Sequence, residues 1–238
     1  MQLDKEVNNS AYIKLFGLSR QQIVDFMSSF NSSLQYTCDT DDTLDTLLII
    51  KFDKKASASV KDNIITSLYK HFYNYIYADE NVSLEQMLVD LLTLYHKYVS
   101  VAESITGGMI SSKIVDIKGA SKVLLEGLVT YSNEAKSARL NINPHLIDQF
   151  GAVSSEVAYE MSVGLLQSHT DFAICTTGYA GPASSQVEEV GLCYISVGTK
   201  QSINVYKYKF CGNREQIRKI STNTALFLLV KLIKDKKF

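Results

Sequence analysis

The sequence lacks the features of a protein that binds a bulk electrostatic partner or a membrane. Its 24 Lys and Arg residues nearly balance 25 Asp and Glu residues, for a formal net charge of −1. Binding to duplex nucleic acid or an anionic membrane requires an excess of cationic side chains, so neither partner is expected. No apolar run is long enough to span a bilayer, and the polar residues 1–9 contain no secretory signal. These absences favour a cytoplasmic protein, and they do not exclude a small polar substrate.

Cysteine and histidine do not occur at the close spacings that metal sites require. The residues concerned are Cys38, Cys175, Cys193, Cys211, His71, His96, His145 and His169. They form no Cys-x-x-Cys or His-x-x-x-His pair. Three of the cysteines lie in apolar runs, which favours reduced, buried thiols, and the histidines are expected to be structural or surface groups. No metal site is therefore expected.

Proline and glycine are also scarce, since two prolines and 12 glycines leave no low-complexity linker. The apolar pattern instead divides the chain into two domains, residues 1–82 and 83–238. The polar cluster 79–81 marks the boundary, because the capping signal Ser83 with Gln86 follows it directly. The elements expected in the first, α+β domain are strands near 12–16, 34–37 and 44–52, a helix capped by Ser19 and a helix over 57–77.

In the second domain, helical and strand patterns alternate, which is typical of a layered α/β domain. The expected helices cover 83–95, a segment from about 108, 135–140, and segments capped by Ser154 and Asn213. The expected strands are 99–103, 123–130, 172–175, 190–197 and 203–210, and Pro144 is expected to break the chain between helices.

Polar residues gather after three of these strands, in residues 103–108, 130–136 and 176–182. Ligands of open α/β sheets bind outside the carboxyl ends of the strands, where loops from different strands meet. If the three loops share one edge of the sheet, they build a pocket.

Ser104 is a candidate nucleophile in the first loop, where a strand stops beside a glycine turn and a helix start. Backbone N–H groups at such a place are unpaired and suit an anion or a developing oxyanion. A serine nucleophile needs a base, and a lysine desolvated beside a tyrosine, here Lys136 and Tyr131 of the second loop, has a lowered pKa. The same loop, with Asn133 and Glu134, also fits a solvated helix start.

The third loop and the last helix add candidate anion contacts. The turn around Thr177 and Gly178 offers backbone N–H groups to a phosphate or oxyanion, although, for these residues taken alone, a strand-to-loop turn that only needs a positive φ is the simpler explanation. Arg214 stands in the first turn of the last helix, where the helix dipole disfavours a cation. This placement hints at an anionic partner, while pairing with Glu215 or solvent is the alternative.

Five stretches together resemble the CinA C-terminal domain, the nicotinamide mononucleotide amidohydrolase of bacterial pyridine-nucleotide salvage. They are residues 102–108, 129–136, 151–154, 177–182 and 212–214, in the order and spacing of that family. The resemblance covers residues 83–234 and implies a three-layer α/β/α sandwich with a mixed sheet. Residues 10–82 resemble the KH-like connecting domain that lies upstream in longer CinA proteins.

The resemblance implies hydrolysis of the carboxamide of nicotinamide mononucleotide to nicotinate mononucleotide and ammonia, without a metal or other cofactor. Ser104 then looks like the nucleophile, activated by Lys136 and Tyr131. The implied substrate-binding residues are Thr106, Gly107, Asn133, Thr177, Gly178 and Arg214. The chain departs from the family at Ile105 and over residues 183–189, which contain none of the usual Gly, Lys and Pro. This departure keeps a second hypothesis open, a catalytically weak or inactive nucleotide-binding or interaction module.

Residues 10–82 contain no Gly-x-x-Gly backbone clamp and no basic run, so their KH-like character does not indicate nucleic-acid binding. Sheet-edge strands and a small accessory domain favour a homodimer. The expected partners are thus a small nucleotide substrate and a second copy of the chain.

Overall fold

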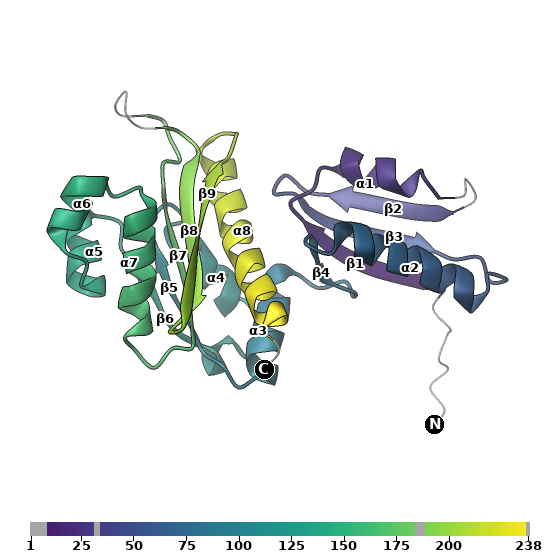
Figure 1. The fold of residues 1–238 in the computed structure, drawn as a ribbon, viewed down its shortest axis with the longest axis horizontal. Helices are drawn as coiled ribbons and strands as arrows, with labels where there is room; N and C mark the ends of the chain where they lie inside the picture. The colour runs from purple at the N-terminus through teal and green to yellow at the C-terminus, as the bar shows by residue number, and fades with distance from the viewer. Residues whose placement is uncertain (1–8, 31–33, 184–188, 237–238) are drawn as a thin grey trace. The chain divides into compact units, whose positions relative to one another are not determined.

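The computed structural model describes residues 9–30, 34–183 and 189–236. The chain divides into two compact units, residues 1–82 and 83–238 (Figure 1). Within the described ranges, no helix combines the length and apolar character that a bilayer crossing requires.

The first unit is a four-stranded sheet with two helices. Its elements are β1 (Ser10–Phe16), α1 (Arg20–Met27), β2 (Gln35–Thr40), β3 (Asp45–Lys51), α2 (Ala58–Phe72) and β4 (Ile76–Ala78), with strand order β2-β3-β1-β4. Apolar side chains of β1 and β3, such as Ile13 and Leu48, form one core with Ile23 of α1 and Leu68 of α2. The capping box expected at Ser19 is confirmed.

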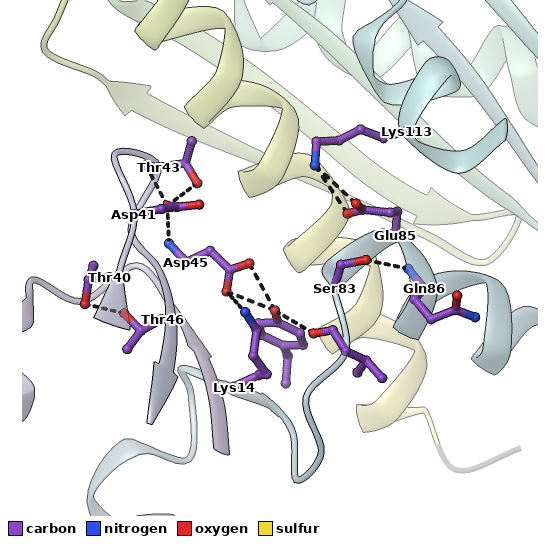
Figure 2. Close-up of polar contacts among 12 residues, drawn as sticks. Lys14, Thr40, Asp41, Thr43, Asp45, Thr46, Ser83, Glu85, Gln86 and Lys113 are labelled. Carbon is purple, nitrogen blue, oxygen red and sulfur yellow. Dashed lines mark hydrogen bonds and ion pairs between the residues drawn. The ribbon is translucent and has the colours of Figure 1, made fainter. Parts of the chain in front are cut away.

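The end of α2 corrects the expected helix over residues 57–77. The helix stops at Phe72, and Ile76–Ala78 forms β4 on the edge of β1. Helical spacing continues through Ile76, but the edge of β1 supplies backbone partners that a longer helix would leave unused. Buried Tyr77 then donates its hydroxyl to Asp45, 2.9 Å away. Figure 2 shows Asp45 also paired with Lys14, at 3.0 Å, on the neighbouring strand.

The second unit is a three-layer α/β/α sandwich around a mixed sheet, which confirms the expected fold class. Its strands, in the order β6-β5-β7-β8-β9, are β5 (Val99–Glu103), β6 (Leu124–Val129), β7 (Phe172–Gly178), β8 (Leu192–Thr199) and β9 (Ser202–Lys209). Its helices are α3 (Leu84–Leu94), α4 (Met109–Val115), η1 (Ala120–Lys122), α5 (Asn133–Leu140), α6 (Pro144–Phe150), α7 (Ser155–Leu166) and α8 (Arg214–Asp235). The long helix α8 packs on one face of the sheet with α3 and α4, and α7 packs on the other with α5 and α6 (Figure 1).

Local sequence signals fix several helix starts in this unit. Ser83 caps α3 by accepting from the N–H of Gln86 (Figure 2), and Asn213 forms the expected capping box of α8. Pro144 does not only break the chain: it is the first residue of α6, where its fixed φ suits a helix and its missing N–H costs nothing.

Strand β7 runs further than the expected strand over 172–175. Thr176, Thr177 and Gly178 still pair with β8, because the antiparallel neighbour continues alongside them. Residues 176–178, which were expected to lie in the third polar loop, are therefore part of the sheet. Their backbone is held rigidly at the carboxyl end of β7.

Candidate active site

The three polar loops meet at one edge of the sheet. Strands β5 and β6 are parallel, as are β5 and β7, so their carboxyl ends point the same way. The loops that follow enclose a cavity of about 330 Å³, which lies at the small end of the ~300–1,000 Å³ range of ligand sites. Its lining includes Ser104, Tyr131, Lys136, Ala152, Val153, Thr177, Gly178 and Arg214.

Ser104 and Lys136 lie in contact inside this cavity. Lys136, the fourth residue of α5, has a side chain that is 1% exposed, and its Nζ lies 3.3 Å from the Oγ of Ser104. The same Nζ donates to the carbonyls of Thr130, at 3.0 Å, and Tyr131, at 3.3 Å. No carboxylate of the described ranges forms an ion pair with it. The lysine is therefore buried against neutral oxygen atoms.

Burial lowers the pKa of Lys136 from 10.5 to about 8, because desolvation penalises the charged ammonium. A substantial fraction of the amine is then neutral at mildly alkaline pH. A neutral amine beside a serine hydroxyl can accept its proton, so the pair has the chemistry of a base and a nucleophile.

The carboxylate of Glu103 holds the segment that follows Ser104. Fully buried at the end of β5, it accepts hydrogen bonds from the N–H groups of Gly108 (2.9 Å), Ile110 (3.0 Å) and Ser111 (2.9 Å). The hydroxyl of Ser111 adds a fourth bond, at 2.8 Å. The N-terminal N–H groups of α4, which the sequence suggested were open to an anion, are thus occupied by Glu103.

Replacing Glu103 by glutamine is expected to destabilise the second unit. The amide keeps the shape of the side chain but exchanges one acceptor oxygen for an NH₂ group, which cannot accept from a backbone N–H. Each buried donor left without an acceptor costs about 1–3 kcal/mol in the free energy of unfolding. Urea unfolding measures the loss, with the exposed Glu156→Gln as the matched control. Equal midpoints for Glu103→Gln and wild type would contradict this role.

Tyr131 and Arg214 contact each other at the cavity. Arg214, the first residue of α8, donates to the carbonyl of Gly181 and, at 3.4 Å, to the hydroxyl of Tyr131. The Tyr131 side chain is 64% exposed. In the described residues, only its backbone carbonyl contacts Lys136, and its phenol forms no hydrogen bond with Ser104. The structure therefore places the phenol with the arginine.

The other implied substrate-binding residues divide into two groups. Thr177 and Gly178 line the cavity, and the hydroxyl of Thr177 donates to the carbonyl of Ala152 at 2.7 Å. A Cβ at Gly178 would meet the carbonyl oxygen of Leu192 at 2.6 Å, so only glycine fits there.

Thr106, Gly107 and Asn133 are not among the residues that line the Ser104 cavity. The hydroxyl of Thr106 is fully buried and bonds that of Thr176 at 2.8 Å. Gly107 adopts a left-handed φ of 59°. Asn133 lines a separate cavity with Glu134.

Sequence reasoning missed two residues that support the site. Glu103 lies within the stretch 102–108 that resembles the CinA family, but its sequence context predicted no contact for it, and none was predicted for Arg218, four positions after Arg214. The carbonyls of Ile105 and Thr106 both accept hydrogen bonds from Arg218.

Among the residues that the structure describes, no three or more His, Cys, Asp or Glu side chains cluster as a metal site would require. Residues 184–188, within the stretch that departs from the family pattern, lie outside the described ranges.

A family model of the CinA C-terminal domain matches residues 81–233. The chain belongs to the CinA family. All residues that line the Ser104 cavity fall inside the matched range, so the cavity is part of the CinA domain.

Curated relatives and solved structures agree with this assignment. A relative from Caldicellulosiruptor saccharolyticus is 40% identical over 185 residues, which are 77% of this chain and 45% of the relative. A CinA-like protein of Fusobacterium nucleatum is 38% identical over 73% of this chain and 43% of its own. The chain thus spans about half the length of the curated relatives that it matches.

The crystal structure of the competence/damage inducible protein CihA from Agrobacterium tumefaciens matches with a TM-score of 0.60 and 32% identity. The match covers 64% of this chain and 99% of that structure.

Proposed function

We propose that this CinA protein hydrolyses the carboxamide of nicotinamide mononucleotide to nicotinate mononucleotide and ammonia. The observation that carries the proposal is the contact between Ser104 Oγ and the buried Nζ of Lys136, at 3.3 Å in a cavity. A serine beside a lysine whose pKa is about 8 suits attack on an amide carbonyl. The family resemblance supplies the identity of the amide.

The proposed reaction has two halves. Neutral Lys136 takes the proton from Ser104 as Oγ bonds to the amide carbon, and the carbonyl oxygen becomes an oxyanion. The C–N bond then breaks, and the leaving nitrogen departs as ammonia with the proton from Lys136. Water attacks the resulting ester with Lys136 as base, which releases the nicotinate nucleotide and restores Ser104.

Arg214 is the proposed contact for the phosphate of the nucleotide. Its guanidinium lines the same cavity as Ser104, and arginine binds phosphate through charge-assisted hydrogen bonds. Arg214→Gln is expected to raise KM for nicotinamide mononucleotide by about tenfold or more, with a small effect on kcat, since such bonds contribute ~1.5–3 kcal/mol.

Steady-state kinetics on two substrates test the role of Arg214. The exposed Arg139→Gln on α5 is the matched control and should keep the KM of wild type. Nicotinamide riboside lacks the phosphate, so its kinetics should respond little to Arg214→Gln. An unchanged KM for the mononucleotide would refute the phosphate contact.

The assignment of function is tested with purified protein and nicotinamide mononucleotide. Ammonia and nicotinate mononucleotide should form in equal amounts, and nicotinamide, nicotinamide riboside and NAD serve as competing amides. No ammonia from any of them at high enzyme concentration would reject the amidohydrolase and favour a nucleotide-binding module. Light scattering on the same sample tests the homodimer, which stays a prediction.

A further inference from the structure

Arg218 lies one helical turn after Arg214 on α8 but has a different target. Its Nε donates to the carbonyl of Ile105 at 3.2 Å, and its Nη2 donates to the carbonyl of Thr106 at 2.8 Å. The guanidinium packs closely on this segment, since a Cβ at Gly107 would lie 3.1 Å from Nη2. The planar fork of an arginine therefore fixes two consecutive peptide units directly after Ser104.

Fixing these carbonyls also fixes two N–H groups. In a trans peptide unit, the carbonyl oxygen and the N–H of the next residue point in opposite directions. With the Ile105 and Thr106 carbonyls turned to Arg218, the N–H groups of Thr106 and Gly107 point away from it. Neither N–H has an acceptor among the described residues. A cation on the carbonyl side also polarises each peptide unit, which makes its N–H a stronger donor.

The flanks of this segment are held by other contacts. The N–H of Ser104 donates to the Thr176 carbonyl at 2.9 Å, and Glu103 occupies the N–H groups of Gly108 and Ile110. Donors before and after are thus occupied, and those of residues 105–107 are left for a ligand. Ile105 lines the Ser104 cavity, so the segment held in this way lies beside the nucleophile, where its N–H groups suit the oxygen of an amide that Ser104 attacks.

We propose that Arg218 is a positioning residue that holds the segment 105–107, of which Ile105 lines the cavity, so that its free N–H groups form the oxyanion hole of the reaction at Ser104. The proposal rests on the proposed acyl transfer and adds to it a division of labour between two arginines on α8. Arg214 binds the substrate and acts on KM. Arg218 never contacts the substrate and acts on kcat through the backbone.

Two readouts separate this role from the identity of the substrate. The first is kcat and KM with nicotinamide mononucleotide for Arg218→Gln and Arg218→Lys, beside Arg214→Gln. The second is the rate at which a fluorophosphonate labels Ser104, followed by intact mass. Labelling expels fluoride and needs the oxyanion hole, but it needs no nucleotide site. Thermal unfolding of each variant confirms that the protein is folded.

Arg218→Gln is expected to lower kcat and the labelling rate by about 10- to 100-fold, with KM nearly unchanged, since loss of an oxyanion-hole donor lowers kcat by ~10²–10³-fold. Arg218→Lys keeps the charge but lacks the fork, so it should recover little of the loss. This variant also supplies the test if Arg218→Gln does not fold. The exposed Arg139→Gln on α5 should label Ser104 at the wild-type rate.

The outcomes are distinguishable. A folded Arg218 variant with unchanged kcat, or with a raised KM alone, overturns the positioning role and leaves the amidohydrolase in place. Wild type that does not hydrolyse the nucleotide but labels Ser104 in an Arg218-dependent way overturns the proposed substrate and supports the positioning role. Wild type that labels no faster than Ser104→Ala overturns both.

Discussion

Ser104→Ala is expected to abolish ammonia release from nicotinamide mononucleotide, with kcat lower by on the order of 10⁴- to 10⁶-fold, as when other serine nucleophiles are removed. The physical reason is the loss of the covalent route: without Oγ, no ester forms, and only attack by water remains. Ser104 is 8% exposed and small, so its loss changes the packing little. The measurement is ammonia release under single-turnover conditions, with intact mass to detect the acyl-enzyme in wild type.

The exposed Ser112→Ala, on α4, is the matched control for this experiment. Alanine favours the helix slightly, so stability and kcat should equal those of wild type. If Ser104→Ala retains the activity of Ser112→Ala, the nucleophile lies elsewhere and the acyl-enzyme mechanism is wrong.

The fold could largely be predicted from periodicity, but not where an element depends on a distant partner. The alternation of helix and strand patterns predicted a layered α/β domain, and the family resemblance implied the three layers and the mixed sheet. The segment around Ile76 carries a helical spacing, and only the free edge of β1 makes it a strand. Pro144 likewise read as a break, because its sequence context did not separate a break from a first helical position.

The residues of the candidate site could be predicted where polar side chains gather in a loop that follows a strand. Ser104 follows β5, and Lys136 lies in α5, the helix that follows the neighbouring parallel strand β6, so topology brings the two residues together across 32 positions. Arg218 contacts a loop more than 110 residues away, through backbone carbonyls that every residue type carries. The sequence around Ile105 therefore contains no signal that predicts a contact with Arg218. Supporting contacts of this kind require the structure.

The position of Tyr131 shows a further limit of sequence reasoning. Its place five residues before Lys136, in the same loop, suggested a phenol near the amine, yet the phenol lies at Arg214 while the backbone carbonyl contacts Lys136. Tyr131 precedes the N-cap Ser132 and lies outside α5, so the helix does not direct its side chain toward that of Lys136. The proposed role of general base therefore rests on Lys136 and its burial, so substitution of this lysine is the second decisive test.

Lys136→Met is expected to lower kcat by about 10²- to 10⁴-fold, the usual contribution of general acid–base catalysis. Methionine fills a similar volume with an apolar chain but accepts no proton. In wild type, kcat/KM should rise with pH and level off above about 8, because only the neutral amine can act as base. Below that pKa the rate should fall tenfold per pH unit. The residual activity of Lys136→Met should lack this limb, which pH profiles of both proteins measure.

Because Lys136 is buried, we also expect that the loss of activity in Lys136→Met does not result from unfolding. Since the pKa of Lys136 is lowered on folding, the unfolded chain binds more protons between about pH 8 and 10.5, so wild-type stability should rise with pH over that window. Lys136→Met removes a buried ammonium but also the donor to the carbonyls of Thr130 and Tyr131, so the two effects offset and its stability at pH 7 should be close to that of wild type, without that slope. The exposed Lys122→Met is the matched control for both measurements. A wild-type profile that is flat through pH 8, or a Lys136→Met variant as active as Lys122→Met, would show that the base is another group.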